Sequence, residues 1–237
     1  MIAPEKRDAR KVSIDEIRNG CLIDTAEDMV ESRMCTVNAE LRNGLEMVKS
    51  IKRGVTFFGS ARTPVDSVFY KKAYNLARRI SQELGYSIIT GGGAGIMGAG
   101  NQGAFDVGGE SVGFTIKLPM EQKTNLFLTK ESPFYYFFTR KVALSFAADA
   151  YVVFPGGYGT LDELTEILTL IQTGKTERVP VILVGKTFWQ PFVDFLKNKV
   201  LEEEKGIDAE DLDLFVLTDD EEEIMGILKK TPARSKV

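Results

Sequence analysis

The sequence has no histidine, only two cysteines and no long apolar run. Without histidine, a Ser-His-Asp or Cys-His catalytic apparatus is excluded, and the commonest metal ligand is missing. Cys21 and Cys35 form no C-x-x-C pattern, which predicts two reduced thiols rather than a disulfide scaffold or a zinc site. No apolar run approaches the ~18 residues of a membrane helix, and residues 1–20 lack the apolar centre of a signal peptide. We therefore expect a soluble, cytoplasmic protein without a membrane partner.

A surplus of positive charge is also absent. The net charge is −4, and the lysine pairs at 71–72 and 229–230 are isolated, so we expect no nucleic-acid partner. The length of 237 residues suits one domain with a sizeable core, with or without an appendage.

Short apolar runs alternate with amphipathic stretches along most of the chain, which is typical of a parallel sheet covered by helices on both faces. We expect an α/β fold, a Rossmann-like doubly wound parallel sheet, over residues 53–237. The predicted strands are 55–58, 86–90, 111–116, 125–129, 151–154, 179–184 and 214–217. The predicted helices are 70–84, 96–107, 134–148, 160–173, 188–204 and 219–230.

Residues 1–52 are expected to form an N-terminal helical extension. Its apolar residues recur at helical spacing, from Val30 and Met34 to Leu45 and Val48. This stripe can pack against its own domain or against a partner subunit, and we favour the partner subunit slightly.

Residues 150–163 read as a buried strand, a glycine loop and the start of a helix. Glycines allow backbone N–H groups to approach an anion, and the helix N-terminus adds about half a positive charge. The alternative is that Thr160 and Glu163 only form a capping box, in which each satisfies the other's backbone N–H. The three glycines at 156, 157 and 159 favour an anion site, because a cap alone does not need them.

Three motifs in order resemble a known family. Residues 155–163, PGGYGTLDE, resemble the PGGxGTxxE signature of the LOG ("Lonely Guy") family, the cytokinin riboside 5′-monophosphate phosphoribohydrolases. Residues 90–98, TGGGAGIMG, are similar to the family's GGGxxGLMG loop, and Arg140-Lys141 to its Arg-Lys pair. The resemblance covers about residues 54–200. Bacterial members are often labelled possible lysine decarboxylases.

The resemblance implies that Arg140 and Glu163 are catalytic. The loops and the resemblance together predict a set of substrate-binding residues, namely Ser60, Gly92, Gly93, Glu121, Lys141, Gly156, Gly157, Tyr158, Gly159, Thr160, Leu161, Asp162 and Thr169. A helical turn beyond the glycine loop, Glu163 is placed to stabilise a positively charged ribose and to activate water. The resemblance further implies AMP-like substrates, no metal or organic cofactor, and a homodimer or larger homo-oligomer.

Three other functions are compatible with parts of the sequence. Residues 93–98 fit the dinucleotide fingerprint G-x-G-x-x-G, but the strand that follows ends in Lys117 rather than in an acidic residue. A lysine decarboxylase would need a Schiff-base lysine for pyridoxal phosphate, and no lysine stands out. A nucleotide-binding protein without catalysis would use the same loops, although binding alone would not require both Arg140 and Glu163.

Overall fold

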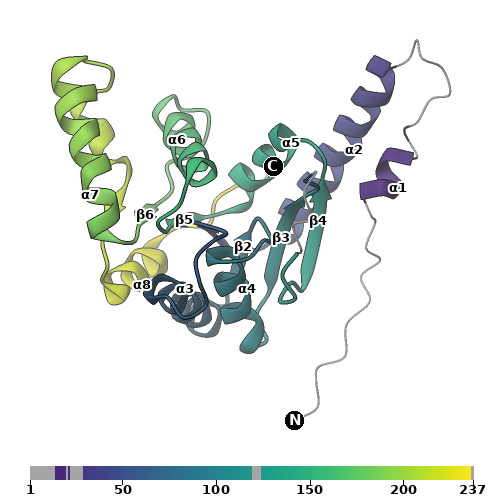
Figure 1. Cartoon of the computed structure of the whole chain (residues 1–237), viewed down its shortest axis with the longest axis horizontal. Helices are drawn as coiled ribbons and strands as arrows, with labels where there is room; N and C mark the ends of the chain where they lie inside the picture. The colour runs from purple at the N-terminus through teal and green to yellow at the C-terminus, as the bar shows by residue number, and fades with distance from the viewer. Residues whose placement is uncertain (1–13, 20, 22–28, 119–123, 236–237) are drawn as a thin grey trace.

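The computed structural model describes residues 14–19, 21, 29–118 and 124–235 of the chain. Seven strands form one sheet, in the order β4-β3-β2-β1-β5-β6-β7, and every neighbouring pair is parallel (Figure 1). The strands are β1 (Gly54–Phe58), β2 (Ser87–Thr90), β3 (Ser111–Ile116), β4 (Lys130–Phe134), β5 (Ala150–Val153), β6 (Val181–Leu183) and β7 (Val216–Leu217). This arrangement confirms the predicted doubly wound α/β fold.

Helices connect the strands and cover the sheet. The α-helices are α1 (Ile14–Asn19), α2 (Met29–Ser50), α3 (Val68–Arg79), α4 (Ile96–Asp106), α5 (Phe137–Ala147), α6 (Tyr158–Gln172), α7 (Lys186–Phe195) and α8 (Glu221–Lys230). The π-helical turns η2 (Ile80–Leu84) and η3 (Leu196–Glu203) extend α3 and α7, and the 3₁₀ helix η4 (Ala209–Leu214) precedes β7. Within the described ranges, no helix combines the length and the hydropathy needed to cross a bilayer.

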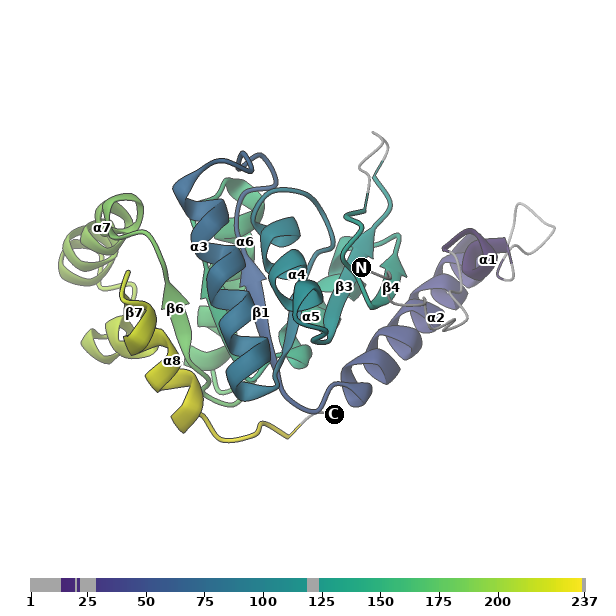
Figure 2. The same cartoon turned by 90° about the horizontal axis from the view of Figure 1, so that it is seen from below.

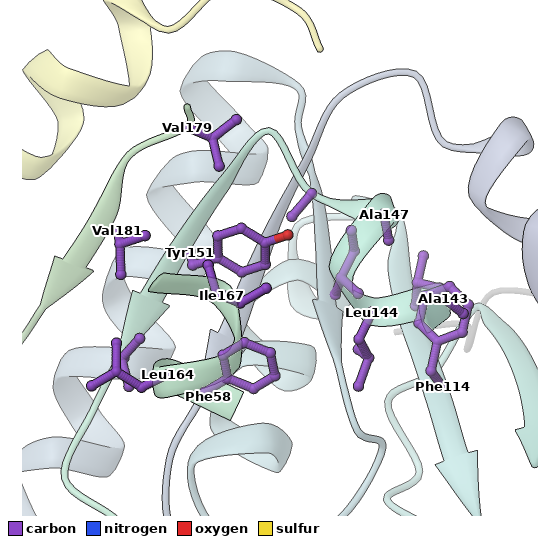
Figure 3. Close-up of a cluster of buried hydrophobic side chains, with 14 of the residues drawn as sticks. Phe58, Phe114, Ala143, Leu144, Ala147, Tyr151, Leu164, Ile167, Val179 and Val181 are labelled. Carbon is purple, nitrogen blue, oxygen red and sulfur yellow. The ribbon is translucent and has the colours of Figure 1, made fainter. Parts of the chain in front are cut away.

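The central strands are buried along their whole length, since they have helices on both faces. On the face visible in Figure 2, Phe57 of β1 packs with side chains of α3, α4 and α8. On the opposite face, Tyr151 of β5 packs with Leu144 of α5 and with Leu164 and Ile167 of α6 (Figure 3). Alternate residues of β1 and β5 therefore face opposite helical layers, and α5 and α6 lie on the same side of the sheet.

The chain reverses its direction of winding between β1 and β5. It runs outward from β1 to β4, then returns to β5 beside β1 and continues to β7. In such sheets, the loops at the carboxyl ends of the strands diverge at this point and leave a crevice in which ligands bind. The loops after β1, β2 and β5 all lie at this edge.

Two predicted strand positions are wrong. Residues 125–129 precede β4, because Asn125 forms a turn there: its Oδ1 accepts from Phe127 N at 3.0 Å. Leu214 ends η4 instead of opening the last strand, because the capping box of Asp208 and Asp211 starts a 3₁₀ helix at Ala209.

Helix α2 packs on its own domain through its C-terminal half. It contacts α5 and β4, and Val48 is fully buried. A Cβ at Gly44 would lie 2.8 Å from the Phe134 ring, so glycine permits the close approach of α2 and β4. Toward the N-terminus, Met29, Val30 and Met34 are exposed. Their packing on a partner subunit, and the domain boundary at residue 52, stay predictions.

The structure joins Cys21 and Cys35 in a disulfide, so the prediction of two reduced thiols is wrong. Helix α1 contacts α2, which brings the two Cα atoms to 5.6 Å, a distance that a disulfide can span. The sequence pattern could not reveal this pair, because their proximity depends on how α1 lies against α2. A cytoplasmic location, which the reduced thiols had supported, stays a prediction.

Candidate functional site

The glycine loop after β5 ends in a helix that starts earlier than its sequence suggests. Helix α6 begins at Tyr158, with Gly157 as the N-cap residue and no side chain bonded to the cap. Thr160 N donates to Gly157 O at 3.0 Å, so Thr160 already lies inside the helix. The alternative interpretation, a capping box of Thr160 and Glu163, is therefore wrong, and the first N–H groups of α6 are left without intrahelical partners.

Gly157 and Gly159 face open space. A Cβ at either position would meet no atom within 4 Å, and Gly157 has a negative φ of −97°. Neither packing nor, at Gly157, backbone strain requires a glycine. Gly156 differs, because a Cβ there would lie 2.0 Å from Thr160 Oγ1. Gly157 and Gly159 thus leave space in front of the N-terminus of α6. Unpaired N–H groups at a helix N-terminus can bind an anion.

The second glycine loop follows β2 and is held by a buried polar network. Gly92 has a φ of +72°, and its N–H donates to Thr90 Oγ1 at 2.9 Å. Thr90 Oγ1 in turn donates to Asn101 Oδ1, and Asn125 Nδ2 donates to both Asn101 Oδ1 and Gly93 O. Sequence reasoning missed this network, because nothing in a single sequence pairs Asn101 with Asn125.

Ser60, after β1, joins the two glycine loops. Its N–H donates to Pro155 O at 3.0 Å, and its carbonyl oxygen accepts from Ile96 N at 3.1 Å. A Cβ at Gly95 would lie 2.2 Å from the same carbonyl oxygen, so glycine is needed for this contact. The structure therefore brings together the loops that contain Ser60, Gly92 and Gly156, as predicted for the carboxyl edge of the sheet.

Arg140 is partly buried and lines a cavity beside the second loop. Its Nε donates to Phe114 O at 2.7 Å, and its Nη2 would lie 2.0 Å from a Cβ at Gly91. Burial lowers the pKa of the guanidinium, and the neighbouring Glu163 opposes this effect. The cavity measures about 150 Å³ and is lined by Gly91, Gly92, Gly93, Met97, Thr115, Ile116, Leu118, Thr124, Phe137 and Arg140.

Glu163 lies close enough to the two cations of α5 for both to act on its carboxylate. Burial raises its pKa to about 7, against the opposing effects of Arg140 and Lys141. Oε2 is buried and accepts no hydrogen bond from the described residues. An unsatisfied carboxylate oxygen that exchanges a proton near neutral pH is suited to general acid–base chemistry.

Lys141 forms ion pairs with two carboxylates of α6. Its Nζ lies 2.9 Å from Asp162 Oδ2 and 3.1 Å from Glu166 Oε2. Burial lowers the pKa of the ammonium, but the interactions with Asp162 and Glu166 outweigh it and leave the pKa above its ordinary value. Lys141 and Asp162, both predicted to contact substrate, therefore contact each other here. Glu166 was not predicted at all.

Two predicted site residues lie apart from this cluster. Leu161 packs against the core, and Thr169 lines another cavity, between α6 and η4, where its Oγ1 donates to Thr165 O. Glu121 lies outside the described residues. Met97 and Phe137 line the Arg140 cavity but were not among the predicted site residues. Within the described ranges, no group of three or more Cys, Asp or Glu side chains is arranged to hold a metal ion.

Comparisons with curated proteins lead to one family. Residues 97–228 match the family model described as possible lysine decarboxylase. The cytokinin riboside 5′-monophosphate phosphoribohydrolase LOG of Oryza sativa subsp. japonica is 33% identical over 131 residues, which are 54% of this chain and 53% of that protein. LOG1 of Arabidopsis thaliana, of the same description, is 29% identical over 164 residues, 67% of this chain and 74% of that protein. The chain thus matches about half the length of the rice relative.

Solved structures share the fold. The crystal structure of TM1055, a structural genomics target, has a TM-score of 0.57 and 25% identity, and the match covers 75% of this chain and 99% of that one. The molybdenum cofactor carrier protein of Chlamydomonas reinhardtii has a TM-score of 0.55 at 20% identity, over 76% of this chain and 98% of that one. The second likeness shows the fold alone. Because the family model matches more than half of the chain, the chain belongs to the possible lysine decarboxylase family, which is the LOG family.

Proposed function

We propose that this protein hydrolyses the N-glycosidic bond of a purine nucleoside 5′-monophosphate, either AMP or an N6-modified AMP. One water is consumed, and the products are the free base and ribose 5-phosphate. The observation that carries the proposal is the buried, unpaired Oε2 of Glu163, which lies beside the cations of α5 and one turn beyond a bare helix N-terminus. The names of the curated relatives support the same class of reaction.

The 5′-phosphate would bind at the N-terminus of α6. Thr160 N already donates to Gly157 O, so the preceding N–H groups, up to Gly159, remain for the phosphate. The helix dipole adds favourable charge there. The cavity of about 150 Å³ is smaller than the ~300 Å³ of a typical small-molecule pocket, so a nucleotide would extend from it along the first glycine loop.

Cleavage of the bond between base and ribose builds positive charge on the ribose. The ionised carboxylate of Glu163 would stabilise that charge and accept a proton from the attacking water. The leaving base gains a proton as the bond breaks. Arg140 would place a fixed positive charge where negative charge develops on the base, since its guanidinium is anchored to Phe114 O and lies at the cavity.

The site does not fit a lysine decarboxylase. Such an enzyme needs a lysine that forms a Schiff base with pyridoxal phosphate. None of the described residues that line the Arg140 cavity is a lysine, and nearby Lys141 is paired with Asp162 and Glu166.

The test is to incubate the protein with AMP and with N6-isopentenyl-AMP, and to follow the release of free base by chromatography. Glu163→Gln keeps the shape of the side chain and removes its charge, so turnover should fall at least ~100-fold. Glu203→Gln, which removes only the exposed ion pair with Lys199, is the matched control and should retain wild-type turnover.

Equal turnover by wild type and Glu163→Gln would refute this mechanism. If the wild type releases no base but binds AMP tightly in calorimetry, the protein is a nucleotide-binding protein rather than a hydrolase. The same substrate comparison identifies the preferred base. Size-exclusion chromatography with light scattering would separately test the predicted homodimer or larger assembly.

A further inference from the structure

Four charged side chains surround Glu163 on two adjacent helices. Arg140 and Lys141 are consecutive on α5, whereas Asp162 and Glu166 flank Glu163 on α6. The only other titratable group known to act on Glu163 from the described residues is the buried hydroxyl of Tyr151 on β5. Two cations and two carboxylates therefore act on Glu163. The pairing among these four groups determines the protonation state of Glu163.

Helical spacing explains why Lys141 has two partners. Residues four apart lie one above the other on a helix, so Asp162 and Glu166 present their carboxylates to the same side of α6. Lys141 Nζ lies between them, 2.9 Å from one and 3.1 Å from the other. The side chain of Lys141 is 18% exposed and that of Glu166 is 31% exposed, so this is a half-buried cluster rather than a solvated surface pair.

We propose that Glu166 is a positioning residue that holds Lys141 away from Glu163, so that the catalytic carboxylate stays unpaired and free to exchange a proton. The proposal rests on the proposed function in that it assigns a use to the unpaired carboxylate. Asp162 accepts the hydrogen bond from the lysine at 2.9 Å, but its side chain is 61% exposed, so water competes for this contact, whereas Glu166 is 31% exposed.

Without Glu166, Lys141 has an obvious second partner. Glu163 lies between Asp162 and Glu166 in the sequence of α6, and its Oε2 accepts no hydrogen bond from the described residues. A lysine released from Glu166 would pair with that oxygen and stabilise the charged form of Glu163. The pKa of the Glu163 carboxyl would then fall, and Glu163 would become a weaker base.

The experiment is the pH dependence of kcat/KM for AMP in Glu166→Gln. This change preserves side-chain shape and removes the charge that holds Lys141. The midpoint of the acidic limb should move down by about one pH unit relative to wild type, the shift expected when a cation approaches a carboxylate. Glu203→Gln, which breaks an exposed pair on η3, should leave the midpoint unchanged.

A second variant separates the action through Lys141 from a direct effect of Glu166 on Glu163. Glu166→Gln combined with Lys141→Met has no lysine to move, so its midpoint should shift less, relative to Lys141→Met alone, than Glu166→Gln shifts the wild type. An equal shift in both backgrounds would mean that Glu166 acts on Glu163 directly, and would overturn the proposal. So would an increase in KM without any shift of the profile.

A carboxyl titration by ¹³C NMR tests the inference without relying on turnover. The Glu163 resonance is identified by its loss in Glu163→Gln, and its titration midpoint should fall in Glu166→Gln but not in Glu203→Gln. If the wild type releases no base, the proposed function fails while this titration still decides the pairing. If the wild type is active and the midpoint of Glu163 does not move in Glu166→Gln, the inference fails alone.

Discussion

Replacing Gly159 with alanine separates the requirements of the fold from those of the ligand. Gly159 is the second residue of α6, and a Cβ at this position would meet no atom within 4 Å. A glycine inside a helix costs about 0.5–1 kcal/mol relative to alanine. For a chain of 237 residues, Gly159→Ala should therefore raise Tm by about 1–4 °C.

The same methyl group should weaken nucleotide binding. It would occupy the space in front of the first N–H groups of α6, where we place the 5′-phosphate. Crowding of a well-packed contact costs about 1–3 kcal/mol, which corresponds to a loss of affinity of roughly 5- to 150-fold. Calorimetry with AMP measures this loss, and thermal unfolding of the same sample measures Tm.

Gly226→Ala is the matched control. Gly226 lies inside α8, and a Cβ there would likewise meet no atom within 4 Å. Its replacement should raise Tm by a similar amount and leave the affinity for AMP unchanged. If Gly159→Ala binds AMP as tightly as Gly226→Ala does, the phosphate does not lie at the N-terminus of α6, and our reasoning about the open glycines is refuted.

Two further predictions concern Glu163 and Glu40. Because burial raises the pKa of Glu163 to about 7 and the ionised form is the active one, kcat/KM for AMP should fall as pH drops below about 7; a flat profile from pH 5.5 to 8 would contradict this role. Glu40 is fully buried and accepts from Tyr135 N at 2.8 Å and from Thr139 Oγ1 at 2.6 Å. Glu40→Ala should therefore lower the free energy of unfolding by about 3 kcal/mol in urea titrations, whereas the exposed Glu46→Ala should change it by less than about 0.5 kcal/mol.

Most of the strands could be predicted from the sequence because each of them is a short apolar run. Runs such as 55–58 and 151–154 are apolar on both faces, as strands between two helical layers must be. The failures at 125–129 and at Leu214 arise where a turn or a cap overrides a weak apolar pattern.

The site was only partly predictable. Its motifs are short stretches of sequence, whereas the hydrogen bonds and ion pairs that hold it together join residues far apart in the sequence. The glycine loops, Arg140 and Glu163 belong to short motifs whose residues lie near one another in the sequence. In contrast, the hydrogen bond of Asn125 to Asn101 and the ion pair of Lys141 with Glu166 join separate elements. Glu40 shows the same limit, since it caps the start of α5 from a helix some 95 residues earlier. No periodicity or composition in one sequence pairs such residues.

Three features at the carboxyl edge of the sheet reduce the stability of the fold. Gly159 weakens a helix, Glu163 buries a carboxylate oxygen that accepts no hydrogen bond from the described residues, and desolvation lowers the pKa of the partly buried Arg140 guanidinium. Each is unfavourable by itself, and the packing of the described residues does not require a glycine at position 159. Natural sequences tolerate such conflicts mainly at functional sites, where a ligand or a reaction uses them. A phosphate beside Gly159 and a developing positive charge beside Glu163 would each relieve one of these conflicts, which is why a single nucleotide explains their occurrence at one edge.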